Sequence, residues 1–396
     1  MLCRKTKCPI LTKIQSFLQI KDVVNQQDVE GSSPPSVFIG RFGYPNVYAG
    51  PLVPPFYGNT DLYDVPEQWF GKTIEEIVDF RMRLIRGQHR VNVTKPENGG
   101  RILEETQYLA MAEHSVDVEL ALLDRPRKIF VLNDEIQPIG PSARIKHLKV
   151  GTTRLDHRIE QAYYDVDLKA ADAVLDLYRR GTLVSKLQRA LSVGVFGVRA
   201  QRRLVPTRWS ITAVDSMISL NLMDQVKTYP LINEYRVYES HYLDNKFEVI
   251  MIPDAWKYEA IEAWYPGTIW NPQSQNIFLI GDWENHNGRT TYARMGGCYY
   301  AARLAVSEKL NQERKQGSVI VLREARPGYI MPVGVWQVRE NVRNALRQPP
   351  LKFSNLREVL EHISHQFYIP LDTWIDNSEL LKESLIQTKL TGFLAT

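Results

Sequence analysis

Hydrophobic residues recur along this chain with two periods, which indicate helices where they lie three or four apart and strands where they alternate. Thr73 is predicted as the N-cap of a helix whose apolar positions are Ile74, Ile77, Val78, Met82 and Ile85. Further helices are predicted over Ile102–Leu123, from about Asp167, and over Tyr292–Leu310, Ser354–Gln366 and Glu379–Ile386. Strands are predicted over Ser36–Ile39, in short pieces over Val131–Val150 with a break at Gly140-Pro141, and over Arg208–Val214 and Asn276–Ile280.

The order of these elements favours an α+β fold. Asn233–Ile252 is predicted to form a hairpin around Asp244-Asn245, and strands do not alternate regularly with helices. We therefore expect a mixed sheet with hairpins and flanking helices, a helical C-terminal region and a flexible tail. The predicted parts are an N-terminal segment 1–30 with two cysteines, an α+β core 31–348 that carries the functional region, a helical region 349–380 and a tail 381–396.

The composition is that of an ordinary globular protein, with 44% hydrophobic and 24% charged residues and a net charge of +4. The longest apolar stretches, such as Val193–Val198, are far shorter than the roughly 20 residues that cross a bilayer. No secretory signal is recognisable, so we expect no membrane partner and a cytoplasmic location. The three cysteines, Cys3, Cys8 and Cys298, cannot make a disulfide framework, which indicates a reducing compartment.

Positive charge is concentrated in one segment. No carboxylate occurs between Asp176 and Asp215, whereas the segment contains Arg179, Arg180, Lys186, Arg189, Arg199, Arg202, Arg203 and Arg208. Such a stretch attracts a polyanion such as DNA through the release of counterions. The alternative is that folding pairs these cations with carboxylates from elsewhere in the chain.

The C-terminal residues carry a spaced motif. Gln387 is followed by an aliphatic residue three positions later and then by an aromatic and a large apolar residue, namely Leu390, Phe393 and Leu394. In a tight turn, residues three apart lie on one face, so these side chains would form an apolar plug beside the glutamine amide. The pattern resembles the clamp-binding peptide of partners of the PCNA sliding clamp, although Leu394 departs from the usual aromatic pair. The alternative is a tail that docks on its own core.

Long blocks of sequence resemble the Nre family of archaeal DNA-repair proteins. The most specific block is SVFIGRFGYP at Ser36–Pro45, followed by AGPLVPP at Ala49–Pro55. Further matching blocks span nearly the whole chain, at Gly140–Ala143, Arg208–Asp215, Gly281–Glu284, Tyr300–Arg303 and Gly334–Glu340. The resemblance implies a role in the repair of DNA damage, and it also implies a clamp-binding peptide at the C-terminus.

One departure from the family pattern concerns zinc. Many members begin with two cysteine pairs that suggest a zinc site, whereas this chain has only Cys3 and Cys8 there, and its first histidine is His89. Because a structural zinc ion needs four ligands, these two cysteines make an incomplete site and zinc is disfavoured. Either the site is lost or the start is truncated.

A candidate catalytic site follows the strand predicted over Asn276–Ile280. If the chain stays extended, Asp282, Glu284 and His286 point the same way and could hold Mg²⁺ or Mn²⁺, with Arg289 placed to bind a phosphate. The alternative is a turn in which these side chains are merely solvated. Asp215, which follows the predicted strand Arg208–Val214, is a second strand-end carboxylate or, preferably, a helix N-cap.

Several arginines are candidates for binding DNA phosphates, because guanidinium groups suit phosphate oxygens. Within the carboxylate-free stretch they are Arg199, Arg202, Arg203 and Arg208. Arg326 and Arg339 lie in or beside segments that carry the family resemblance.

Two functions agree with these features. One is a metal-dependent nuclease or DNA end-processing phosphodiesterase that acts at the sliding clamp, with Asp282, Glu284, Arg289 and Asp215 as catalytic residues. The other is a non-catalytic adaptor that binds DNA and recruits repair factors to PCNA. The size of the core and its strand-end polar residues favour the enzyme slightly, and no nuclease motif supports it directly.

Overall fold

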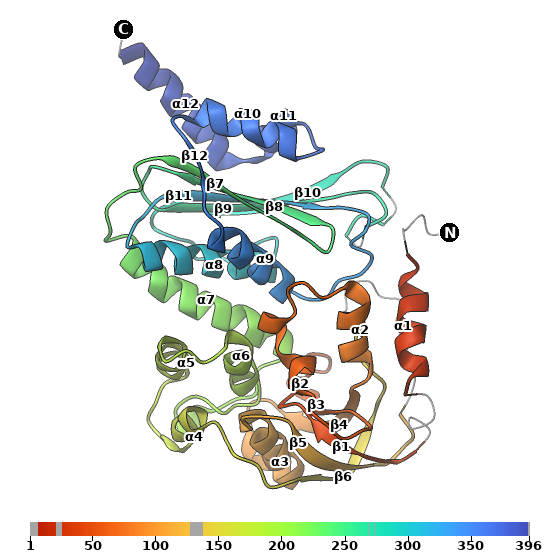
Figure 1. The fold of residues 1–396 in the computed structure, drawn as a ribbon. Helices are drawn as coiled ribbons and strands as arrows, with labels where there is room; N and C mark the ends of the chain where they lie inside the picture. The colour runs from red at the N-terminus through yellow and green to blue at the C-terminus, as the bar shows by residue number, and fades with distance from the viewer. Residues whose placement is uncertain (1–6, 21–25, 127–137, 269, 273, 395–396) are drawn as a thin grey trace. The chain divides into compact units, whose positions relative to one another are not determined.

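The computed structural model describes residues 7–20, 26–126, 138–268, 270–272 and 274–394, with side chains up to Ile386. Contacts divide the chain into two compact units, Cys8–Ile218 and Ser219–Thr396, which we call the N-terminal and C-terminal units. The division falls inside the segment 31–348 that the sequence predicts as one core. Each unit is built on a mixed six-stranded sheet with helices, so the predicted α+β class is confirmed (Figure 1).

The sheet of the N-terminal unit is mainly antiparallel. Its strand order is β1-β5-β6-β4-β3-β2, and only β4 and β6 are parallel. The strands are β1 (Asp28–Ser33), β2 (Val37–Ile39), β3 (Asn46–Val53), β4 (Ile85–Asn92), β5 (Val116–Leu122) and β6 (Ser142–Val150). The predicted strand Ser36–Ile39 is thus confirmed as β2. Of the predicted pieces in Val131–Val150, residues 131–137 lie outside the described residues, and β6 begins at Ser142, directly after the predicted break at Gly140-Pro141.

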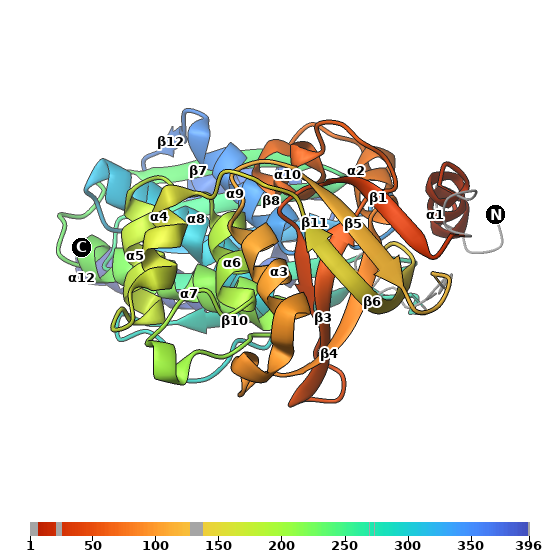
Figure 2. The same ribbon diagram turned by 90° about the horizontal axis from the view of Figure 1, so that it is seen from below.

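The helices of this unit are α1 (Pro9–Leu18), α2 (Ile74–Met82), α3 (Gly100–Met111), α4 (His157–Tyr164), α5 (Ala170–Arg179) and α6 (Val184–Ser192), with 3₁₀ turns at Asp61–Asp64, Pro66–Gln68, Pro96–Gly99 and Arg199–Gln201. Figure 2 shows α4, α5 and α6 grouped together, with α1 at the opposite end of the unit. The predicted cap of α2 is confirmed: the Thr73 hydroxyl accepts from the Glu76 N–H, and Glu76 accepts from the Thr73 N–H.

Two predicted helices extend beyond the end of the helix in the structure. The helix capped by Thr73 ends at Met82, so Ile85 lies in β4 instead. The helix predicted over Ile102–Leu123 is wrong in its second half, where Val116–Leu122 alternates between buried and exposed side chains as strand β5. The strand pattern within that half has period two, and the continuous apolar content of the segment concealed it.

The strand predicted over Arg208–Val214 is wrong. These residues open helix α7 (Thr207–Val226). Side chains four apart in this helix are all buried, namely those of Ser210, Val214, Ile218, Leu222 and Val226. The small polar residues on this face made a helical stripe look like the alternation of a strand.

The C-terminal unit has the strand order β10-β9-β11-β8-β7-β12, in which only β9 and β11 are parallel. The strands are β7 (Tyr235–Tyr242), β8 (Asn245–Ile252), β9 (Lys257–Trp264), β10 (Phe278–Glu284), β11 (Ser318–Ala325) and β12 (Leu351–Phe353). The predicted hairpin is confirmed as β7 and β8. Its turn residues Leu243 and Asp244 both have positive φ angles, 52° and 55°, as two-residue hairpin turns require.

Helices cover both faces of this sheet (Figure 1). One face packs against α8 (Gly297–Glu313), α9 (Trp336–Arg347) and the end of α7, and the other packs against α10 (Leu356–Gln366), α11 (Leu371–Asn377) and the start of α12 (Glu379–Leu394). The central strands β8 and β11 are buried along their whole length because both faces are covered. No helix in the described part of the chain is long and apolar enough to span a membrane.

Candidate functional site

The predicted strand-end carboxylates lie inside a strand. Strand β10 extends to Glu284, so Asp282 and Glu284 belong to the strand and, being two residues apart, lie on one face of it. The strand predicted over Asn276–Ile280 is confirmed from Phe278 onward as β10, which is an edge strand whose residues are mostly partly exposed. His286 lies beyond the strand in an exposed turn that is closed by the Gly288 N–H donating to the Asn285 carbonyl.

Asp282 is held by two arginines of the loop between β10 and α8. Its Oδ2 accepts a hydrogen bond of 2.8 Å from the Arg289 guanidinium and one of 2.7 Å from the backbone N–H of Arg294. Burial by itself would raise the pKa of Asp282, but these hydrogen bonds outweigh it, and the pKa lies below its ordinary value. The Arg289 guanidinium also lies 4.8 Å from the centre of the Tyr299 ring. Asp282 is therefore a charged anchor for this loop.

Glu284 forms a buried ion pair with Arg303 of α8. The Nη1–Oε2 distance is 2.8 Å, and both side chains are almost fully buried. Arg303 also donates to the Ser219 hydroxyl at 3.2 Å, and its guanidinium lies 5.1 Å from the centre of the Tyr300 ring. The second carboxylate oxygen of Glu284 is buried and has no hydrogen-bond partner among the described residues. Arg303 is not among the residues predicted for the site, although it ends one of the blocks that carry the family resemblance.

This arrangement is a poor fit to a divalent metal. The charges of Asp282 and Glu284 are already compensated by Arg289 and Arg303, and a metal would have to displace both guanidinium groups. Among the described residues, the ligand atoms of three metal-binding side chains come within 4.8 Å of one another elsewhere, at Glu239, Glu248 and His362.

That second cluster joins the hairpin to α10. Glu239 accepts from Lys246 at 2.9 Å and lies 2.6 Å from the His362 ring, and Lys246 also pairs with Glu248 at 2.9 Å. Burial raises the pKa of Glu248 to about 8, although Lys246 opposes this. The Lys246 ammonium pairs with both carboxylates, those of Glu239 and Glu248, as in a structural ion network. Nothing in the spacing of these residues along the chain indicated the cluster, because β7, β8 and α10 bring them together.

Asp215 lies in the middle of α7, so the predictions of a helix N-cap and of a strand-end carboxylate are both wrong in their placement. Its side chain is fully buried and accepts a hydrogen bond of 2.9 Å from the Gln188 amide. Asp215 therefore links α7 to α6.

The carboxylate-free stretch divides into structural and exposed cations. Arg189 is buried and pairs with Asp64 at 2.7 Å, and Lys186 pairs with Asp156. Arg202 donates to the backbone carbonyls of Tyr163 at 2.6 Å and of Gly197 at 2.8 Å. Burial lowers the pKa of Arg202. These side chains stabilise the helices around them.

Three arginines of the stretch remain available. Arg199, Arg203 and Arg208 are exposed, and within the described part of the chain none of them forms an ion pair. By contrast, Arg326 pairs with Glu324 at 2.8 Å, and Arg339 is buried in α9 beside Glu340. The geometry thus separates the predicted phosphate-binding residues into an exposed group in the N-terminal unit and a structural group in the C-terminal unit.

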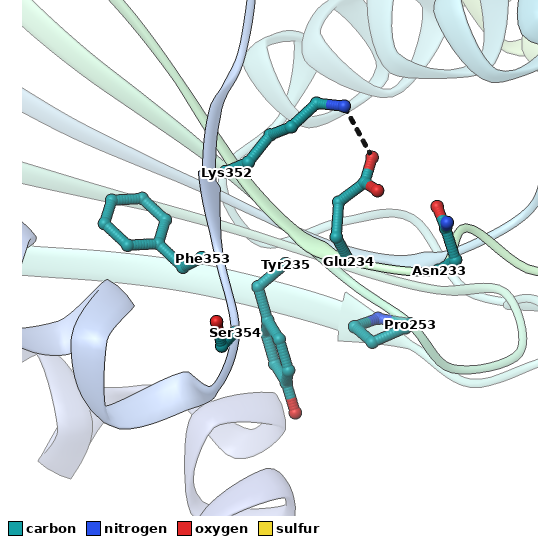
Figure 3. A pocket seen from close by; sticks show the side chains of 7 residues that line it. All are labelled: Asn233, Glu234, Tyr235, Pro253, Lys352, Phe353 and Ser354. Carbon is teal, nitrogen blue, oxygen red and sulfur yellow. Dashed lines mark ion pairs between the residues drawn. The ribbon is translucent and has the colours of Figure 1, made fainter.

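A hollow of about 420 Å³ lies where β12 pairs with β7 (Figure 3). The two charged side chains on it, Lys352 and Glu234, pair with each other at 3.4 Å, and Glu234 also pairs with Arg236. The hollow therefore offers no unpaired charge to a ligand.

The clamp motif lies at the end of α12, which crosses the predicted boundary between residues 380 and 381 and continues to Leu394. The side chains of Gln387, Leu390, Phe393 and Leu394 lie outside the described ones. Cys3 also lies outside the described residues, and Cys8 is the N-cap residue of α1. The predicted roles of these residues stay predictions.

Comparison with known proteins identifies the family. Residues 2–271 match the family model described as archaeal Nre, N-terminal, and residues 284–393 match archaeal Nre, C-terminal. The chain is 39% identical to the DNA repair protein NreB of Archaeoglobus fulgidus, over 98% of this chain and 96% of the relative. It is 35% identical to NreA of the same organism, over 99% and 96%, and 34% identical to NreA of Haloferax volcanii, over 85% and 82%. No solved structure matches the chain. With both family models matched and relatives aligned over nearly its whole length, the chain belongs to the archaeal Nre family.

Proposed function

We propose that this chain is a DNA-repair protein that binds DNA through exposed arginines of its N-terminal unit and attaches to the PCNA sliding clamp through residues 387–394. The curated relatives are named DNA repair proteins, which supports the general role. The observation that carries the DNA-binding part is the set of three exposed arginines, Arg199, Arg203 and Arg208, that have no ion pair within the described residues. Unpaired guanidinium groups on a surface bind phosphates and release counterions.

Of the two roles that the sequence left open, the non-catalytic adaptor is the one that the geometry supports best. A catalytic carboxylate has to be available to a metal, a water molecule or a substrate. Asp282 and Glu284 are instead bound by Arg289 and Arg303, and Asp215 is buried against Gln188. This reverses the slight preference for an enzyme.

The clamp-binding part rests on the motif. Gln387, Leu390, Phe393 and Leu394 have the spacing of a clamp-binding peptide. DNA binding and clamp binding are assigned to different units of the chain, so that the protein could engage both at once.

The DNA-binding surface is tested by charge reversal. In fluorescence anisotropy titrations with a labelled DNA duplex, Arg203→Glu/Arg208→Glu is expected to weaken binding at least about tenfold. The plot of log affinity against log salt should lose about 2 in slope, because each lost phosphate contact removes about 0.9. Arg144→Glu/Arg154→Glu is the matched control with the same change in charge, since both are exposed arginines of the same unit that are already paired, with Asp124 and Glu113. An equal effect of the control would show that only net charge matters.

The competing nuclease role rests on one observation, the buried and unpaired second oxygen of Glu284. Incubation of labelled single-stranded, nicked and flapped DNA with Mg²⁺ or Mn²⁺ tests it. The adaptor role predicts no products from any substrate. Products from the parent chain that disappear in both Asp282→Asn and Glu284→Gln, while circular dichroism shows both variants folded, would establish the nuclease instead.

A further inference from the structure

Four aromatic side chains of the N-terminal unit are exposed to solvent around the β2–β3 loop. Phe42 is 77% exposed, Tyr44 51%, Trp209 45% and Tyr48 37%. The rings of Tyr44 and Trp209 lie 5.4 Å apart at their centres with a tilt of 51° between them. The Arg41 guanidinium lies 5.3 Å from the centre of the Phe42 ring. Large exposed aromatic groups cost solvation energy, and a cluster of them indicates a binding surface.

Backbone hydrogen bonds bring the segments that carry these rings together. Trp209 lies in the first turn of α7, where the Thr207 hydroxyl accepts from the Ile39 N–H at the end of β2. The Val93 N–H after β4 donates to the Pro45 carbonyl, and the Leu204 N–H donates to the Val93 carbonyl.

The strand pairing adds Tyr48 to the same neighbourhood. Tyr48 is directly opposite Arg90 in the β3–β4 pair, so these two side chains share one face of the sheet. The Tyr48 carbonyl also accepts from the Gly40 N–H, which ties the loop to β3. The loop, two strand ends and the start of α7 therefore form one fixed scaffold, which we call the aromatic surface: Arg41, Phe42, Tyr44, Tyr48, Arg90, Arg203, Arg208 and Trp209.

The charge of the aromatic surface is positive. Its arginines are exposed and form no ion pair within the described part of the chain. All three segments that build it lack carboxylates: none occurs in residues 31–60, 80–96 or 177–214. Acid-free segments from three distant parts of the sequence thus meet at the place where the rings are exposed.

We propose that the aromatic surface binds single-stranded DNA, with unpaired bases stacked on Trp209 and Tyr44 and the backbone phosphates held by the arginines around them. This inference rests on the proposed DNA-binding function and names the form of DNA that it takes. Exposed rings within reach of unpaired guanidinium groups are the combination that binds single strands without sequence preference, since every base has a flat face. A continuous duplex keeps its bases stacked inside and can use only the arginines.

Not every exposed ring of this unit lies in positively charged surroundings. Tyr57 is also exposed, but its hydroxyl donates to Glu30, and the carboxylates of Asp117 and Glu119 lie near enough to act on it. The negative charge of these carboxylates repels phosphate. Tyr57→Ala therefore removes an exposed ring of the same unit without touching the proposed surface, and it serves as the matched control.

The experiment compares three labelled ligands with the full chain at constant salt: a 20-nucleotide thymidine strand, an abasic strand with the same number of phosphates, and a duplex. The thymidine strand is expected to bind at least about tenfold more tightly than the abasic strand, because stacking on two rings contributes where phosphates are equal. Trp209→Ala and Tyr44→Ala should each remove most of that difference and change duplex affinity less than about twofold. Trp209→Phe should retain it, and Tyr57→Ala should behave as the parent chain.

The outcomes separate this inference from the proposed function. Equal binding of the thymidine and abasic strands, or unchanged binding in Trp209→Ala, would overturn base stacking while leaving phosphate binding intact. The DNA-binding proposal itself would be overturned if Arg203→Glu/Arg208→Glu bound every ligand as tightly as the parent chain does. It would also be overturned if the parent chain bound none of the ligands. A preference for a uridine RNA strand over the thymidine strand would overturn the assignment to DNA. Circular dichroism of each variant verifies that it is folded.

Discussion

Removing the charge of Glu284 is expected to destabilise the C-terminal unit strongly. Glu284 and Arg303 are among the most deeply buried side chains of the unit, and their closest atoms are 2.8 Å apart. In Glu284→Gln, Arg303 keeps its charge and its contacts with Ser219 and Tyr300 but loses the counter-charge. Breaking one side of a buried ion pair typically costs about 3–5 kcal/mol. We expect a loss of about 3 kcal/mol, since the glutamine amide can still accept one hydrogen bond from Arg303.

The double variant Glu284→Met/Arg303→Met separates charge from packing. Both charges and their desolvation disappear together, so its stability should return to within about 1–2 kcal/mol of the parent chain. Two compact units need not unfold together, so a single global transition is an unsafe measure. Hydrogen exchange of amides in α8 and β9, measured with increasing urea, reports on this unit directly. A loss below 1 kcal/mol in Glu284→Gln would refute the reasoning, since a carboxylate that can be replaced freely is available for other chemistry.

Two further predictions concern the chain end and a buried carboxylate. A chain ending at Ile386 is expected to lose binding to PCNA in calorimetry. Phe393→Ala is expected to weaken binding at least about tenfold, because an aromatic anchor carries much of the binding energy of a small interface. Equal PCNA affinity of the parent chain, the shortened chain and Phe393→Ala would reject the motif. Burial raises the pKa of Glu248 from 4.5 to about 8, so the folded chain holds a proton that the unfolded chain releases. This contribution to stability is fully present below about pH 4.5 and is lost as the pH rises through about 8. Glu248→Gln should remove this loss. Between pH 5 and pH 9 the unfolding free energy of the variant, relative to that of the parent chain, should therefore rise by at most about 5 kcal/mol. A difference between the two unfolding free energies that does not change with pH would contradict the assignment.

Features with a local cause could be predicted from the sequence. The N-cap at Thr73 and the hairpin of β7 and β8 each depend on a few neighbouring residues, and both were predicted. The start of α7 could not be found in this way. Its buried stripe begins with Ser210, which is buried only because it donates to the Gln188 carbonyl of α6. A polar residue in a buried stripe has no signature in the sequence when its partner comes from a different helix.

The same distinction between nearby and distant partners in the sequence applies to the candidate site. The sequence placed Arg289 near Asp282 but gave no partner for Glu284, because Arg303 comes from a helix that follows the strand at a distance. The pairing of Arg189 with Asp64 crosses 125 positions of sequence, and that of Lys186 with Asp156 crosses 30. Counting charges along a segment therefore overstates the positive field that the folded segment presents.

The same pairings make the remaining arginines more informative. A carboxylate-free segment has to take its counter-charges from elsewhere, and the fold supplies them at the buried Arg189 and the half-buried Lys186. It supplies none, within the described residues, to Arg203 and Arg208. An exposed arginine needs no counter-charge from the protein, so Arg203 and Arg208 are available to a ligand beside the exposed Trp209. Phosphate is the counter-charge that a DNA-repair protein meets, and a stacked base is the partner that an exposed indole accepts.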